Sequence, residues 1–187
     1  LYNQKWKYPP ETIISRSFFD SNIKDFYKFY REKLIVKEAK PNITHYKLAE
    51  LEKAGKLLAI VTQNIDGLHQ AAGSKKVYEL HGSTLRNYCM NCGEFYDVDF
   101  IVNSEHTENQ IPICKKCNGI VKPDVVLYEE GLDNTTIDGA INAISQADTL
   151  IIGGMEEIGW RGFWLKRELQ INEQRRFWVV LKVGIVW

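Results

Sequence analysis

The sequence predicts an α/β fold: an open parallel sheet covered by helices, with a small zinc-ribbon module inserted into it. Three observations lead to this prediction. Short apolar runs alternate with segments of helical periodicity. Two Cys-x-x-Cys pairs lie between two of these runs. Polar clusters follow the runs at the points where strands are expected to end.

The composition is that of an ordinary soluble globular chain. In 187 residues, 24 Lys and Arg balance 24 Asp and Glu, so there is no excess positive charge to bind nucleic acid. The apolar runs are far shorter than the roughly 20 residues of a membrane helix, so we expect no membrane span. Residues 1–7 lack the basic start and apolar core of a secretory signal, and we expect the chain to begin within a longer protein.

Two helices are predicted before the first strand. Residues 18–36 carry apolar side chains at helical spacing, and Pro41 follows as a breaker. Residues 42–54 form the second helix, which Asn42 can cap and Gly55 can end.

The strands are predicted from short apolar runs. Such runs are typical of parallel strands that are buried on both faces. They are residues 57–62, 77–80, 125–128 and 149–152. A helical stretch over residues 135–146 separates the last two, as expected for an open parallel sheet.

The cysteines form two pairs, and the chain contains no other cysteine; they are Cys89, Cys92, Cys114 and Cys117. Four thiolates close a tetrahedral zinc site and leave no position for water, so the predicted metal is structural. A redox dithiol or a pair of disulfides is the alternative. Reduced thiols indicate a reducing compartment.

Polar side chains gather after two neighbouring strands. Asn64 and Asp66 follow the strand at 57–62 and can present an amide and a carboxylate to a bound sugar or amide. The alternative is a turn that caps the next helix. His81 follows the next strand, and Gly82 behind it permits the close approach of a ligand.

Four stretches, in this order, resemble the sirtuins, the family of NAD-dependent protein lysine deacylases. They are Thr-Gln-Asn-Ile-Asp-Gly-Leu-His (62–69), Glu-Leu-His-Gly-Ser (79–83), the cysteine pairs, and Ile-Val-Lys-Pro-Asp-Val-Val (120–126). The resemblance implies an incomplete doubly wound, Rossmann-like sheet. It places the NAD-binding domain at 1–86 and 123–154, the zinc ribbon at 87–122, and a divergent tail of uncertain structure at 155–187.

The resemblance also implies roles for individual residues. His81 matches the general base that acts on the nicotinamide ribose, and Asn64 and Asp66 complete the catalytic set. The expected NAD contacts are Gln63, Asn64, Asp66, Gly153 and Gly154. The expected contacts to an acetylated protein lysine are Val125, Val126 and Tyr128, with the peptide added as a strand. The implied cofactors are NAD and zinc.

The implied activity is lysine deacetylation in the cytoplasm, with release of nicotinamide and transfer of the acetyl group to ADP-ribose. A catalytically silent fragment that binds only zinc and peptide is one alternative, and an ADP-ribosyltransferase is another. Sirtuins that remove acidic acyl groups carry Tyr-x-x-Arg, where this chain has Tyr27 and Tyr30. That favours acetyl-lysine, although Arg31 lies next to the arginine position.

The chain departs from the family pattern at both ends. It has no glycine before Gly55, so the glycine-rich loop that holds the NAD diphosphate is missing from it. Met155, Glu156 and Glu157 stand where a Thr-Ser phosphate turn is expected, and two carboxylates there would repel a diphosphate. Residues 155–187 are interpreted as a frame-shifted or spliced tail, or else as a genuine divergent end with a helix near 161–170 and a strand at 177–183.

Overall fold

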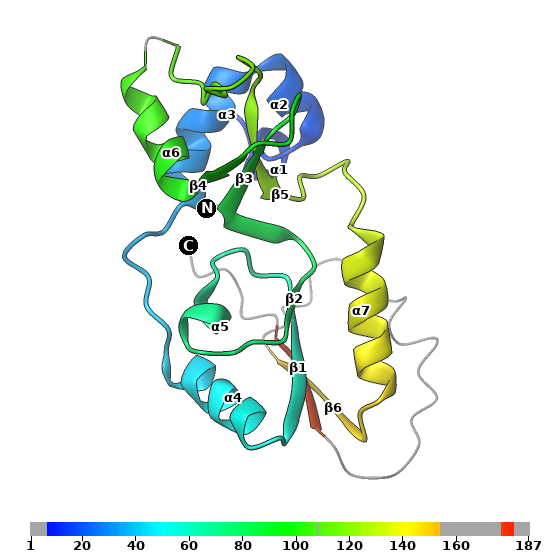
Figure 1. Cartoon of the computed structure of the whole chain (residues 1–187). Helices are drawn as coiled ribbons and strands as arrows, with labels where there is room; N and C mark the ends of the chain where they lie inside the picture. The colour runs from blue at the N-terminus through cyan, green and yellow to red at the C-terminus, as the bar shows by residue number, and fades with distance from the viewer. Residues whose placement is uncertain (1–6, 108, 154–176, 182–187) are drawn as a thin grey trace.

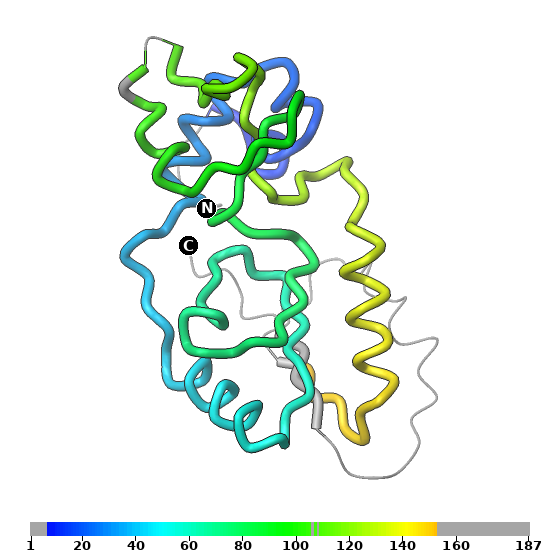
Figure 2. The backbone as a smooth tube through the Cα atoms, in the orientation of Figure 1, coloured from blue at the N-terminus to red at the C-terminus, as the bar shows by residue number. Residues whose placement is uncertain are grey.

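The structure of the chain, a computed structural model, describes residues 7–107, 109–153 and 177–181. Two lobes lie one above the other in Figure 1. We call them the sheet lobe, which holds a parallel sheet, and the ribbon lobe, which holds the four cysteines. Figure 2 shows the backbone passing between the lobes near residues 35–42, near residue 80 and near residues 128–134.

The sheet lobe contains a four-stranded parallel sheet in the order β2-β1-β7-β6. The strands are β1 (Leu57–Thr62), β2 (Val77–Glu79), β6 (Thr149–Gly153) and β7 (Phe177–Leu181). The helices of this lobe are α4 (Ile43–Lys53), α5 (Leu68–Ala71) and α7 (Asn134–Ser145). The predicted parallel sheet is therefore confirmed.

Strand β1 lies between helices on both faces of the sheet (Figure 1). Ala59 and Val61 pack with buried residues of α7, whereas Leu57 and Ile60 pack with Leu48 of α4. Because both faces are covered, every residue of β1 can be apolar or β-branched, which explains its sequence Leu-Leu-Ala-Ile-Val-Thr. This is the doubly wound arrangement that the sequence predicts.

The ribbon lobe contains a three-stranded antiparallel sheet in the order β4-β3-β5. Its strands are β3 (Gly82–Cys89), β4 (Phe95–Asp97) and β5 (Val121–Val125). Its helices are α1 (Pro10–Ile13), α2 (Arg16–Ser21), α3 (Ile23–Phe29), the π-helix η1 (Tyr30–Leu34), α6 (Val98–Asn103) and the 3₁₀-helix η2 (Ser104–His106). Aromatic residues of α2, α3 and η1 form one core cluster with Cys89, Cys114 and Val121.

Two of the predicted elements are wrong. The helix expected over 18–36 is divided, because Asn22 leaves the helical region with φ −135° between α2 and α3, and the last turn is a π-helix. The strand expected at 125–128 lies earlier, at Val121–Val125, and belongs to the antiparallel sheet of the ribbon lobe. A short apolar run does not indicate which sheet a strand joins.

The other predicted elements are confirmed. Asn42 caps α4 by accepting hydrogen bonds from the amides of Thr44 and His45. Gly55 follows α4 with φ +67°, a conformation that favours glycine. Residues 134–145 form α7, close to the predicted range. Gly154 lies outside the described residues, and of the tail the structure describes only β7, which pairs with β1 and β6.

Candidate functional site

The carboxyl ends of β1 and β2 lie side by side. Thr62 is in register with Glu79, and the amide of Leu80 donates to the carbonyl of Thr62 at 2.9 Å. Residues 63–67 and His81 therefore leave the sheet at the same edge, where open parallel sheets bind ligands. His81 itself is half-buried.

Hydrogen bonds hold the loop 63–67 against the start of β3. The carbonyl of Ile65 accepts from the amide of Thr84 at 2.9 Å and from its hydroxyl at 3.1 Å. The amide of Asn64 donates to the hydroxyl of Thr62. These contacts join the loop after β1 to the strand that follows His81, so both candidate segments share one rigid frame.

Asn64 and Asp66 differ in their partners. The carboxylate of Asp66 accepts from the amide of Leu68 at 3.0 Å, so Asp66 does cap the turn into α5, as the alternative interpretation expects. Asn64 is 5% exposed, and among the described residues its side-chain oxygen has no hydrogen-bond partner. A buried acceptor without a partner costs about 1–3 kcal/mol, which a donor from a ligand can offset. This observation fits an amide or ribose bound at the strand ends.

A cavity of about 40 Å³ lies beside Asp66, between the lobes. Its lining includes Leu34, Thr84, Leu85 and Val98. This volume admits water, whereas ligand pockets measure roughly 300–1,000 Å³. This cavity alone is therefore too small to hold a dinucleotide.

The remaining predicted contact residues lie at the ends of β1, β5 and β6 or in the segments that follow β1 and β5. The amide of Val126 donates to the carbonyl of His81 at 3.0 Å, which places the start of the 125–128 segment beside the histidine. The carbonyl of Val125 accepts from the ammonium of Lys122. Tyr128 pairs with Ser15 in a parallel bridge, and Gly153 ends β6. Gln63 is half-buried at the end of β1.

Gly82 has no room for a side chain. Its φ is +74°, and an added Cβ would collide with the carbonyl oxygen of Asp124 on β5. Gly82→Ala is therefore expected to lower the free energy of unfolding by about 3 kcal/mol, from the left-handed backbone and the forced shift together. The measurement is urea unfolding, with Gly55→Ala as the control. Gly55 also has a positive φ, but its Cβ would meet nothing within 4 Å. Equal losses of unfolding free energy in the two variants would contradict the close approach of the Asp124 carbonyl to Gly82.

The four cysteines come together as the spacing predicts. Their sulfur atoms all lie within 4.8 Å of one another, and all four thiols are free of disulfides. Burial raises the pKa of Cys114, but hydrogen bonds from the Tyr96 hydroxyl and two backbone amides outweigh it and lower the pKa to about 6. The amide of Gly119 lowers the pKa of Cys117, but the neighbouring thiols and burial raise it to about 12.

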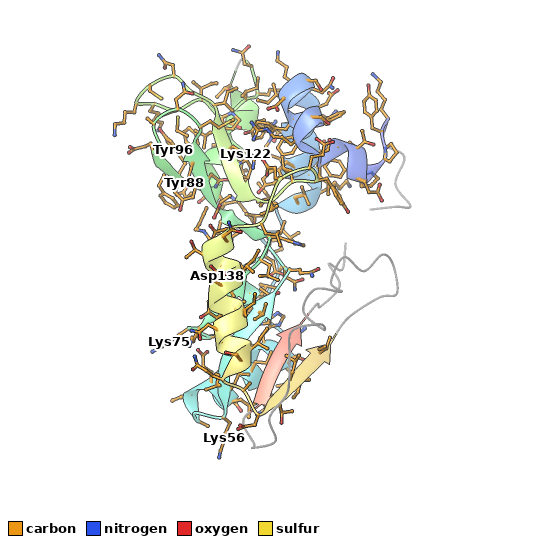
Figure 3. All side chains as sticks on the ribbon, turned by 90° about the vertical axis from the view of Figure 1, so that its right-hand side faces the viewer. Lys56, Lys75, Tyr88, Tyr96, Lys122 and Asp138 are labelled. Carbon is orange, nitrogen blue, oxygen red and sulfur yellow. The ribbon has the colours of Figure 1, made fainter. Side chains whose placement is uncertain are left out.

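Four thiolates in this cluster need a cation, because ionisation of one thiol opposes ionisation of its neighbours. A dication supplies the missing charge, and the donor set fits tetrahedral zinc. Tyr96, seen in the ribbon lobe in Figure 3, donates to Cys114 at 3.2 Å and accepts from the amide of Lys115 at 2.8 Å. This tyrosine was not predicted, since nothing in the cysteine spacing marks it.

A second unpredicted feature is a pair of buried histidines behind the loop 63–67. The rings of His45 and His69 lie 4.7 Å apart between α4 and α5, and among the described residues neither ring nitrogen of His69 has a hydrogen-bond partner. Burial and the neighbouring His45 lower the pKa of His69 to about 4, while Asp66 opposes the shift. Both rings are therefore neutral near pH 7.

Acid is expected to destabilise the sheet lobe through His69. Its pKa is about 6.5 when unfolded and about 4 when folded, so below pH 6.5 the unfolded chain binds the proton more tightly. The contribution of about 3 kcal/mol is complete above pH 6.5 and is lost as the pH falls toward 4. The measurement is the pH dependence of unfolding for wild type and His69→Asn. If the two curves run parallel between pH 6.5 and 4, His69 is not the responsible group.

Comparison with known proteins gives related chains over most of the length. A model of the Sir2 family matches residues 1–157. An "NAD-dependent protein deacetylase" of Clostridium acetobutylicum is 62% identical over 175 residues, which cover 92% of this chain and 70% of that protein. A protein of the same name from Clostridium perfringens is 60% identical over 156 residues, 82% of this chain and 62% of that protein.

A solved structure of a Sir2 protein has a similar fold. A structure described as "Sir2 bound to acetylated peptide" superposes with a TM-score of 0.77 at 36% identity, covering 87% of this chain and 68% of that one. Among the described residues, none of the helices combines the length and apolar character needed to cross a bilayer. The polar strand ends and the four-cysteine ribbon both lie within the part matched by the family model. The chain belongs to the Sir2 family.

Proposed function

We propose that this chain carries out NAD-dependent deacetylation of protein lysines, in which nicotinamide is released and the acetyl group passes to ADP-ribose. The observation that carries the proposal is the arrangement of His81, Asn64 and Asp66 at adjacent strand ends of a Sir2-family chain. The relatives named as deacetylases from Clostridium acetobutylicum and Clostridium perfringens support it, and the chain spans 70% and 62% of their respective lengths.

Each residue has a defined task in this proposal. When bound, NAD would supply the ribose carbon that accepts the acetyl oxygen as its bond to nicotinamide breaks, and water would then complete the release of lysine. The buried amide of Asn64 and the carboxylate of Asp66 orient the nicotinamide and its ribose, and Gln63 contacts the same sugar. His81 accepts a proton from a ribose hydroxyl, the general-base role that histidine side chains perform most often in enzymes. Gly153 and Gly154 let the backbone approach the phosphates.

The substrate peptide is proposed to bind along the edge of β5 and the segment that follows it. Strand β5 is at the edge of its sheet, with β3 on one side only among the described residues. Backbone pairing there would involve Val125 and Val126, with Tyr128 beside the acyl chain. The structural relative described as bound to acetylated peptide supports this class of substrate.

Acetyl-lysine is the proposed substrate in preference to lysines with acidic acyl chains. Tyr27 and Tyr30 are fully buried, and the Tyr27 hydroxyl donates to the carbonyl of Val121. Arg31 donates to the Ser104 hydroxyl and to the carbonyl of Gln110. Its guanidinium is thus engaged elsewhere, and a carboxylate on the acyl chain would lack a bidentate partner. Because the cysteines are free thiols, we place the activity in a reducing compartment, the cytoplasm.

The test is an assay of the zinc-loaded chain with NAD and an acetyl-lysine peptide. The expected result is equal release of nicotinamide and deacetylated peptide. Nicotinamide release with the acetyl group retained would instead indicate an ADP-ribosyltransferase. If calorimetry shows no binding of NAD while the peptide still binds, the chain is a catalytically silent binding module and the proposal is wrong.

A further inference from the structure

Arg86 on β3 joins two carboxylates from two other strands. Its Nε donates to Asp124 on β5 at 2.8 Å, and one terminal nitrogen donates to Glu79 at the end of β2 at 2.7 Å. We call Glu79, Arg86 and Asp124 the Arg86 clamp. The Glu79 side chain is only 7% exposed, so its charge requires this partner.

Glu79 and the strand partner of Asp124 lie on either side of His81 in the chain. Glu79 lies two residues before the histidine, and Asp124 is in register with Ser83, two residues after it. Between them, the amide of Val126 donates to the carbonyl of His81. The guanidinium therefore holds the short segment 79–83 directly at Glu79, and at Ser83 through its strand partner Asp124.

The clamp also spans the two lobes. Glu79 belongs to the parallel sheet, whereas Arg86 and Asp124 belong to the antiparallel sheet of the ribbon lobe. The guanidinium is planar and presents its donors in fixed directions, so it sets the relative orientation of the strands that it contacts. Ion pairs of partly buried groups add little net stability, because desolvation offsets most of the attraction. The expected effect of the clamp is therefore on orientation.

We propose that Arg86, Glu79 and Asp124 are positioning residues, which hold segment 79–83 so that the His81 ring faces the loop carrying Asn64 and Asp66. This inference rests on the proposed function, in which His81 acts as the base. Displacing a catalytic group by about 1 Å can cost about 100-fold in rate, whereas binding of NAD by other residues is affected less.

The experiment compares Arg86→Gln with Arg16→Gln. Arg16 is a matched control, since it also joins an Asp and a Glu, Asp20 and Glu130, and its side chain is 38% exposed, as is that of Arg86. Arg86→Gln is expected to lower kcat for nicotinamide release 10- to 100-fold while the KM for NAD changes less than threefold. Arg16→Gln is expected to keep kcat within twofold of wild type. It should also lose less thermal stability than Arg86→Gln, because Glu130 keeps its bonds from Lys122 and the Leu127 amide, whereas the buried Glu79 carboxylate loses the guanidinium. Arg86→Lys is expected to recover part of the rate, because it keeps the charge and loses the paired geometry.

Amide hydrogen exchange provides a readout that needs no activity. Exchange at Val126 is expected to be faster in Arg86→Gln and unchanged in Arg16→Gln, because only the former loosens the segment 79–83. If wild type is active and the two variants have equal kcat, the clamp inference fails and the proposed function stands. If wild type releases no nicotinamide, the proposed function fails, and equal exchange at Val126 in both variants would then also overturn the clamp.

Discussion

Replacing His81 with alanine is expected to lower nicotinamide release by about 10²–10⁴-fold, the range contributed by a general base. The substitution removes a half-buried side chain at a strand end, while the hydrogen bond from the Val126 amide to the carbonyl of residue 81 remains. The fold and the bound zinc should therefore be unaffected. The measurement is the initial rate of nicotinamide release with NAD and acetyl-lysine peptide both saturating.

The thermal melting curve and the zinc content serve as controls for this variant. Both should match wild type, since His81 is not one of the four residues that can hold the metal. Retention of more than a tenth of the wild-type rate would show that another group accepts the ribose proton.

Replacing Cys92 with serine is expected to remove the zinc and unfold the ribbon lobe. Structural zinc contributes about 10 kcal/mol or more to folding of small zinc domains, comparable to the entire stability of a typical domain. The unfolding should extend beyond the two Cys-x-x-Cys turns, because Cys89 and Cys114 share one core cluster with Phe19, Phe26 and Tyr27 of the N-terminal helices. Zinc content, thermal melting and limited proteolysis measure the effect.

Met90→Ala is the matched control for the cysteine variant. Met90 lies between Cys89 and Cys92 and is 45% exposed, so removal of its side chain should leave both the metal and the core in place. An unchanged melting curve of Cys92→Ser, or equal protease sensitivity in the two variants, would exclude a structural role for the metal.

Sequence patterns predicted the parts of the fold that depend on local signals. The run at 57–62 is apolar because helices cover both faces of the sheet, and the structure has a strand at those residues. The side chain of Asn42 caps α4 by accepting from amides only two and three residues later in the chain. The four cysteines were recognisable because metal ligation fixes their spacing.

Features that depend on distant residues were not predictable in this way. The sheet joined by Val121–Val125 is decided by its pairing with β3, more than thirty residues earlier in the chain. The division of the helix at Asn22 allows the rings of Phe19 and Phe26 to pack edge to face, with centroids 4.9 Å apart, a packing that helical periodicity does not reveal. Glu79, Arg86 and Asp124 are likewise brought together only by the pairing of β3 with β5 and by the position of the end of β2 beside them.

Strand β7 has a consequence for the order in which the chain folds. Strands β1 and β6 each pair with β7, and in the described sheet they do not pair with each other. Until residues 177–181 have been synthesised, the ribosome-bound chain can join only β2 to β1. The sheet then closes through contacts of high sequence separation, which form slowly and leave strand edges open to other chains in the meantime. We therefore expect an aggregation-prone intermediate during synthesis, which chaperones would protect.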